Sequence, residues 1–285
     1  MANDRLGTTI IDELRLCFLA EPVFLDTLSG LRLGEHLDLD KFSILRVVAQ
    51  NFEYYFNLIA NEQVAAYIYF GRYGDVSNYL WVKVNNKILY DEVRLRELLS
   101  DIQSTFPIKF NNITKIDLAK DFKRNITYSI NRLCRAKDIK TIINGKVVKD
   151  RKKVVKELKY TYEANLERVM HPSITLCQIE AIRNKSKGVT VQAYNKLAEV
   201  DKSNKEYIKE FYGNPKTLHR LEVRLNYNEI RDFYILHKRT STTDDIFDKE
   251  FMTEMFYYHL GSVLRFTRGR KPISWREILC TDNTR

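Results

Sequence analysis

The chain has 285 residues and a mass of 33.8 kDa, which is enough for one large domain or two small ones. Its 44% hydrophobic and 29% charged residues, with only 5 Pro and 10 Gly, are typical of a globular protein and exclude a disordered chain or a fibrous repeat. The net charge of +10 is uneven, because residues 1–106 carry 10 Lys and Arg against 15 Asp and Glu, whereas residues 107–285 carry 37 against 22.

No apolar run approaches the roughly 18 residues that a membrane-spanning helix needs, and no secretory signal is legible near the amino terminus. The four cysteines lie far apart and form no Cys-x-x-Cys pair, so we expect reduced thiols rather than a zinc cage or a disulfide framework. The sequence therefore predicts a cytoplasmic protein without a membrane partner.

Strand and helix patterns alternate along the chain. In the first part, strands are expected at residues 9–18, 63–70 and 79–84 and a helix at 91–104, while 40–59 fits either. Further on, we expect strands at 113–122, 174–183, 189–196 and 218–227, a basic helix at 149–170 and an apolar helix at 244–267. The predicted fold class is α+β, with antiparallel sheets and packed helices.

A short internal repeat supports a division into halves. Ile11-Asp12 resembles Ile116-Asp117, and residues 82–87 resemble residues 191–196, at offsets of 105 and 109. If the repeat is real, two similar halves form one catalytic domain, and a chance match is the alternative. The expected divisions are an acidic, degenerate half at 1–106, a basic catalytic half at 107–240 and a helical tail at 241–285.

Basic residues are densest between residues 120 and 159, where 14 Lys and Arg face 4 Asp and Glu. Such a stretch attracts phosphate backbones, which makes nucleic acid the leading partner, with a solvated helical face as the alternative. The residues that we expect to contact DNA, in this stretch and on the strand at 218–227, are Lys120, Lys123, Arg124, Lys149, Arg151, Lys152, Lys153, Arg220 and Arg224.

Three expected strands carry polar residues two or four positions apart, which places them on one face. The sets are Asp117 with Asp121, Arg220 with Glu222 and Arg224, and Tyr194 with Lys196. If the strands are neighbours, this face suits phosphodiester cleavage: a phenol attacks phosphorus, carboxylates hold a divalent cation, and a basic group balances the developing charge. The ordinary pKa of tyrosine is about 10, so the phenol needs help from Lys196 or a metal.

Three motifs occur in a fixed order: IDLAKDF at residues 116–122, VQAYNKLAE at 191–199 and HRLEVRL at 219–225. Over residues 113–230 the chain resembles the replication initiation proteins of rolling-circle plasmids and filamentous phages. The patterns of that family run like R-x-D-x-x-x-D, Y-D/N-K-x-x-E and R-x-E-x-R-L. The resemblance implies a single-strand endonuclease that nicks a replication origin through a phosphotyrosine and a divalent metal, leaving a 3′-hydroxyl.

Carried over by motif, the resemblance implies Tyr194 as the nucleophile, Lys196 as its electrostatic partner, and Asp117, Asp121 and Glu222 as metal or active-site acids. Two departures are that Lys115 stands where the family's leading Arg is expected, and that no His-x-His pair is present. A mainly carboxylate site suits Mg²⁺ or Mn²⁺. The implied partners are origin DNA, single-stranded or cruciform, with bacterial host replication proteins and a second copy of the chain as further candidates.

Each assignment has an alternative. Asp117 and Asp121 could lie on a solvated strand face, and Glu222 could be a structural ion-pair partner of Arg220 or Arg224. Glu180 is a further candidate acid, and the other candidate nucleophiles are Tyr160, Tyr162, Tyr207 and Tyr212. The competing functional classes are a DNA-binding initiator or repressor that does not cut DNA, and a structural or host-takeover protein of a phage.

Overall fold

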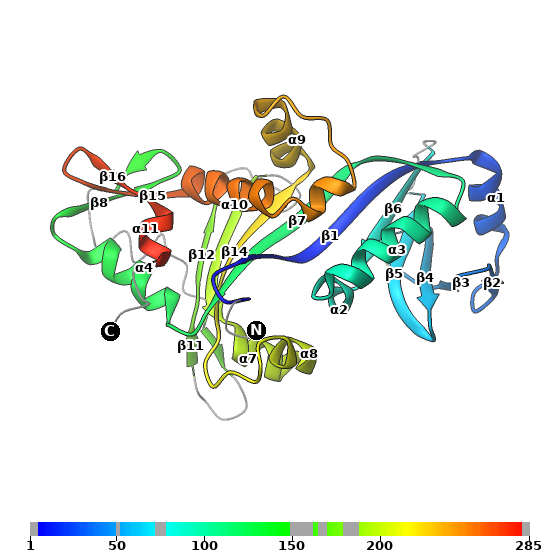
Figure 1. Cartoon of the computed structure of the whole chain (residues 1–285), viewed down its shortest axis with the longest axis horizontal. Coiled ribbons are helices and arrows are strands. Elements are labelled where there is room, and N and C mark those ends of the chain that lie inside the picture. Colours follow the sequence, from blue (N-terminus) through cyan, green and yellow to red (C-terminus); the bar gives the residue numbers. More distant parts are fainter. Residues whose placement is uncertain are drawn as a thin grey trace. The chain divides into compact units, whose positions relative to one another are not determined.

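The structure is a computed structural model, and it describes residues 5–49, 52–71, 78–148, 162–164, 170–178 and 188–280, with backbone alone at 162–164 and 170–172. The fold is α+β, as predicted (Figure 1). Two compact units are present: unit 1 comprises Met1–Ile10, Asp117–Glu229 and Lys249–Arg285, and unit 2 comprises Ile11–Ile116 and Ile230–Asp248. Two boundaries of the units lie inside long strands, after Ile10 and Ile116, and the other two lie after Glu229 and Asp248, so they differ from the divisions expected after residues 106 and 240.

Unit 2 is built on an antiparallel sheet with the strand order β7-β1-β6-β5-β4-β3-β2. Its strands are β1 (Thr9–Ala20), β2 (His36–Asp38), β3 (Ser43–Val47), β4 (Tyr54–Ala60), β5 (Gln63–Phe70), β6 (Tyr79–Val84) and β7 (Ile108–Phe122), and β1 and β7 also contribute residues to unit 1. Its helices are α1 (Pro22–Gly30), α2 (Asn86–Leu89), α3 (Glu92–Thr105), most of α9 (Tyr227–Leu236) and the 3₁₀ helix η2 (Asp244–Phe247).

Helix α3 illustrates how the sequence determines an element of unit 2. The Asp91 side chain caps the helix by accepting a hydrogen bond from the Arg94 backbone N–H, and Pro107 follows the last turn, as predicted. Its buried face consists of Leu95, Leu98, Leu99 and Ile102. This face matches helical spacing, and α3 crosses in front of β5 and β6 in Figure 1.

Unit 1 contains a sheet with the order β12-β13-β14-β7, a sheet with the order β16-β15-β8-β9, and the pair β10-β11. Its further strands are β8 (Ile139–Ile143), β9 (Lys146–Val147), β10 (Tyr162–Ala164), β11 (Met170–Pro172), β12 (Ile174–Cys177), β13 (Thr190–Asn195), β14 (His219–Asn226), β15 (Leu264–Arg268) and β16 (Lys271–Ile273). Its helices include α4 (Ile126–Arg135), α7 (Lys196–Ser203), α8 (Glu206–Phe211), α10 (Lys249–Val263) and α11 (Trp275–Cys280).

The core of unit 1 lies on one face of the β12-β13-β14-β7 sheet. Leu221, Val223 and Leu225 alternate along β14 and are fully buried, as their parity predicts. Helix α10 lies across these strands (Figure 1), and its buried side chains include Met255 and Phe256. The polar residues of β14 therefore lie on the opposite face of this sheet, where the candidate site is found.

Three predicted elements differ from the structure. Residues 40–59, left open between helix and strand, contain β3 and most of β4. The helix expected at 244–267 ends at Val263. Residues Leu264–Arg268 instead form β15, which pairs with β8 and has alternating buried and exposed side chains. The helix expected at 149–170 is wrong at Tyr162–Ala164 and Met170, which are in strands, and the rest of it lies outside the described residues, as do residues 179–187.

The sheet order also corrects part of the repeat. Ile11-Asp12 and Ile116-Asp117 do lie in two long strands, β1 and β7. However, residues 82–84 belong to β6, which neighbours β1, whereas residues 191–195 belong to β13, which β14 separates from β7. The two similar segments therefore do not hold equivalent positions. Among the described helices, none has both the length and the apolar character that a membrane span requires.

Candidate active site

The three motif strands are neighbours, as the predicted polar face requires. Strand β14 lies between β13 and β7, and the β13–β14 register places Tyr194 beside Arg220 and Gln192 beside Glu222. Residues of equal parity on these strands project to the same side of the sheet. The predicted polar residues of the three strands are therefore close enough to interact.

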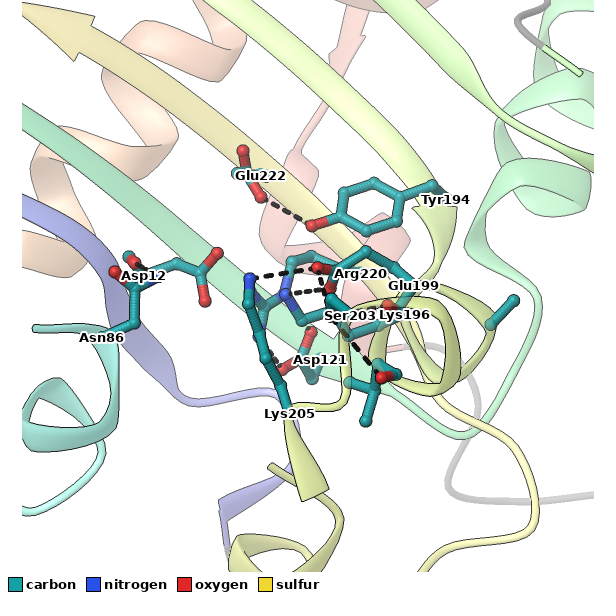
Figure 2. Close-up of polar contacts among 12 residues, drawn as sticks. Asp12, Asn86, Asp121, Tyr194, Lys196, Glu199, Ser203, Lys205, Arg220 and Glu222 are labelled. Carbon is teal, nitrogen blue, oxygen red and sulfur yellow. Dashed lines mark hydrogen bonds and ion pairs between the residues drawn. The ribbon is translucent and has the colours of Figure 1, made fainter. Parts of the chain in front are cut away.

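Four of these residues form a connected group, which we call the Tyr194 cluster: Tyr194, Glu222, Arg224 and Asp117. The Tyr194 hydroxyl donates a hydrogen bond of 2.8 Å to Oε2 of Glu222 (Figure 2). Nε of Arg224 donates to Oε1 of Glu222 and lies 3.5 Å from Oδ2 of Asp117. Two carboxylates thus share one guanidinium, and one of them also holds the phenol.

Burial within the Tyr194 cluster is uneven. The Asp117 and Glu222 residues are 4% and 1% exposed, whereas the side chain of Arg224 is 40% exposed. Burial alone would lower the pKa of Arg224, but the charges of Glu222 and Asp117 raise it. The cluster therefore presents a charged guanidinium to solvent beside two buried carboxylates.

A second polar group on the same strands is buried, and its members bond to one another. Both Asp121 oxygens accept hydrogen bonds from Arg220, at 2.7 and 2.6 Å, and Tyr212 donates a third of 2.8 Å. Asp121 and Arg220 are completely buried and Tyr212 is 4% exposed. The predicted metal role of Asp121 and DNA contact of Arg220 are therefore wrong, because the two charges neutralise each other away from solvent. The same burial excludes Tyr212 as a nucleophile.

Lys196 lies at the start of α7, where the Asn195 side chain caps the helix by accepting from the Ala198 backbone N–H. Its side chain is buried, and Nζ lies 2.7 Å from Oε2 of Glu199 and 5.8 Å from the centre of the Tyr194 ring. Burial would raise the pKa of Glu199, but Lys196 and then Lys205 lower it. Lys196 therefore places a positive charge, paired with the carboxylate of Glu199, near the ring of the candidate nucleophile Tyr194.

The remaining predicted DNA contacts have different outcomes. Lys120 is buried and donates to the Gly7 carbonyl at 2.7 Å, so its predicted contact with phosphate is wrong. Its position is even on β7, which turns it toward the rings of Phe256 and Tyr257 on α10. Arg124 is half-buried and donates to two backbone carbonyls of α11, those of Ile278 and Leu279. Lys123 is exposed, while Lys149, Arg151, Lys152 and Lys153, like Glu180 and Tyr160, lie outside the described residues.

The buried Lys120 gives a testable pH dependence. Burial, with a smaller contribution from Arg276, lowers the pKa of Lys120 from 10.5 to about 8. The unfolded chain therefore binds more protons between these values, so stability should rise with pH across this interval. Relative to Lys120→Met, the free energy of unfolding of the wild type should increase by on the order of 1 to 3 kcal/mol. Urea unfolding of both chains near both ends of the interval measures this, and parallel pH profiles would refute it.

The described acids of the site do not form a complete set of ligands for a divalent cation. Among the residues that the structure describes, no group of three or more His, Cys, Asp or Glu side chains is arranged to hold a metal ion. Asp121 is committed to Arg220, which leaves Asp117 and Glu222 from the predicted set of three. Mg²⁺ usually binds one or two carboxylates together with water and substrate phosphates, and both of these acids are paired with Arg224.

The chain was also compared with known proteins. Neither the known protein families nor the curated proteins contain a match. Among solved structures, the chain is similar to one described as the rolling circle replication initiator protein from Geobacillus stearothermophilus. The two are 12% identical, the match covers 95% of each chain, and the TM-score is 0.47. At this identity the similarity concerns the fold alone.

Proposed function

We propose that the chain initiates rolling-circle replication by nicking one strand of origin DNA, with Tyr194 as the nucleophile. The observation that carries this proposal is the hydrogen bond from the Tyr194 hydroxyl to the buried carboxylate of Glu222. A phenol that attacks phosphorus must lose its proton, and a carboxylate 2.8 Å away is a general base within reach.

The proposed step uses the atoms of the Tyr194 cluster as follows. Oη of Tyr194 transfers its proton to Oε2 of Glu222 and forms a bond to phosphorus. The bond from phosphorus to O3′ of the preceding nucleotide breaks, and O3′ leaves with the electron pair and takes a proton from water. The products are a phosphotyrosine and a free 3′-hydroxyl. Arg224, which is partly exposed, faces the developing negative charge.

Mg²⁺ or Mn²⁺ is the proposed cofactor, with Asp117 as the residue that would hold it, because Glu222 takes the proton of Tyr194. When bound, the ion would neutralise charge on the scissile phosphate. Lys196 is the proposed source of a further positive charge, because its Nζ lies 5.8 Å from the centre of the Tyr194 ring. Origin DNA is the proposed substrate, with host replication proteins as further partners.

A covalent-adduct assay tests the proposal. Labelled single-stranded oligonucleotides that tile the replicon encoding the chain are incubated with the protein and Mn²⁺, then separated by denaturing electrophoresis. A band that joins protein and DNA is expected, and a chelator should abolish it while binding persists. A protein that binds DNA without cutting it would give no adduct at any metal concentration, and that result would refute the proposed function.

The two acids of the Tyr194 cluster give a further prediction. Glu222→Gln keeps the shape but removes the proton acceptor, so the initial rate of adduct formation should fall by about 10²-fold or more. Asp117→Asn should also lower this rate and should raise the Mn²⁺ concentration needed for half-maximal activity. Glu210→Gln, at an exposed position on α8, is the control and should leave the rate unchanged. Wild-type rates in both site variants would remove these acids from the mechanism.

A further inference from the structure

The sheet of unit 2 has one face rich in aromatic rings, which we call the aromatic face: Phe52, Tyr55, Tyr67, Tyr69, Tyr79 and Trp81. The strand register places Tyr69 between Tyr55 on β4 and Trp81 on β6. The ring planes of Tyr69 lie within 11° of Tyr55 and within 10° of Trp81, with centroids 5.8 and 6.1 Å apart. Neighbouring strands thus hold a row of nearly parallel rings.

The aromatic face is distinct from the core face of the same sheet. On the core face, Phe56, Ile68 and Val82 are completely buried. On the aromatic face, Tyr69 is 5% exposed, and Tyr55, Tyr67 and Trp81 around it are half-buried. Tyr79, with its cross-strand partner Leu19, is exposed, at 38% and 43% respectively. Large apolar groups on a strand face that solvent can reach indicate a binding surface rather than a packing surface.

Basic side chains adjoin the rings. Lys83 is the cross-strand partner of both Arg15 and Tyr67. Arg15, Lys83 and Lys115 all lie within 4.0 Å of the carboxylate of Glu13, and each is partly exposed. Three positive side chains thus lie around the carboxylate of Glu13 at this place, although residues 1–106 as a whole are acidic.

We infer that the aromatic face binds single-stranded DNA, with bases stacked on Tyr67 and Trp81 and phosphates near Arg15, Lys83 and Lys115. Stacked aromatic side chains flanked by positive charge bind single strands of any sequence, because every base has a π-face. In duplex DNA the bases are stacked inside the helix and cannot stack on these side chains. The choice of DNA as the nucleic acid rests on the proposed function, in which nicking frees a single strand.

The fluorescence of Trp81 can report this binding directly. The chain has two tryptophans, and Trp275 is buried in unit 1 with Nε1 donating to the Leu264 carbonyl. Oligo(dT) is titrated into a Trp275→Phe, Tyr194→Phe chain, whose emission comes from Trp81 and which cannot form an adduct by the proposed route. Saturable quenching is expected, with weaker quenching by duplex DNA. If Trp275→Phe fails to fold, the same titration of Tyr194→Phe is compared with Tyr194→Phe, Trp81→Leu, in which the quenching should be lost.

Affinity measurements test the individual side chains. Tyr67→Leu and Trp81→Leu should each weaken oligo(dT) binding by about 5- to 150-fold, the range measured for loss of one stacked base. Tyr258→Leu, at a tyrosine on α10 that is 50% exposed, is the control and should leave the affinity unchanged. Arg15→Gln and Lys83→Gln should each lower the slope of log K against log salt by about 0.7, whereas Arg94→Gln on α3 should not.

The outcomes separate this inference from the proposed function. Three results would each overturn the inference. They are the absence of Trp81 quenching, affinities of Tyr67→Leu and Trp81→Leu equal to that of the control, and tighter binding of duplex than of single-stranded DNA. If the wild type forms the covalent adduct while Trp81 stays silent, the aromatic face fails and the nicking proposal stands. If Trp81 is quenched by oligo(dT) but no adduct forms with any oligonucleotide, the aromatic face binds single-stranded DNA and the nicking proposal fails.

Discussion

Tyr194→Phe should abolish the covalent protein–DNA adduct while the chain still folds and binds DNA. The change removes one oxygen, the atom that the proposed mechanism joins to phosphorus, and it alters the volume very little. Removal of a nucleophile typically lowers the rate of its reaction by on the order of 10⁴-fold or more, so the adduct should fall below detection. Denaturing electrophoresis measures the adduct, and a filter-binding titration measures DNA affinity in parallel.

Tyr128→Phe is the matched control, because Tyr128 lies on α4 of the same unit and is 65% exposed. It should form the adduct at the wild-type rate. An adduct of undiminished yield from Tyr194→Phe would show that another residue attacks the phosphate, and the cluster around Glu222 would then have a binding or structural role.

Asp121→Asn should be among the most destabilising substitutions in unit 1. The change removes the carboxylate that pairs with the guanidinium of Arg220, which is completely buried. Removing one member of a buried ion pair costs about 3 to 5 kcal/mol. The free energy of unfolding, measured by urea denaturation, should fall by this amount.

Two comparisons separate burial from charge. The Arg268–Asp138 pair has side chains that are 66% and 61% exposed, so Asp138→Asn should cost no more than about 1 kcal/mol. Replacing both buried partners, as Asp121→Leu with Arg220→Met, should recover much of the stability that Asp121→Asn loses, because no unpaired charge stays in the core. If Asp121→Asn and Asp138→Asn have equal effects, the buried pair does not stabilise unit 1 as described.

Local patterns were sufficient to predict the strands of the site and the face that carries it. Alternation of apolar and polar residues predicted β14, and the parity of Arg220, Glu222 and Arg224 placed them together on one face. These features depend on residues close together in the sequence, which a single sequence displays directly.

Features that depend on distant parts of the chain were not predictable in the same way. Asp117 and Asp121 have equal parity on β7, and only their partners on β14 distinguish an acid in the Tyr194 cluster from one neutralised by Arg220. Lys120 is inside because α10 covers its face of β7. The aromatic face needed the register of three strands, although the alternation of Tyr67 and Tyr69 on β5 was a visible signal.

The closed Asp121–Arg220 pair has a consequence for how faithfully the site assembles. A strand that slips by two residues keeps the same side chains facing the same way, so hydrophobic alternation alone does not exclude it. Such a slip would place Arg220 across from Ala119 in one direction and Asp121 across from Glu222 in the other. The first slip would bury Arg220 without a carboxylate, and the second would bury two carboxylates side by side. The ion pair therefore favours the alignment in which Asp117 meets Arg224. In chains that lose the pair, we therefore expect misaligned and inactive molecules alongside correctly folded ones.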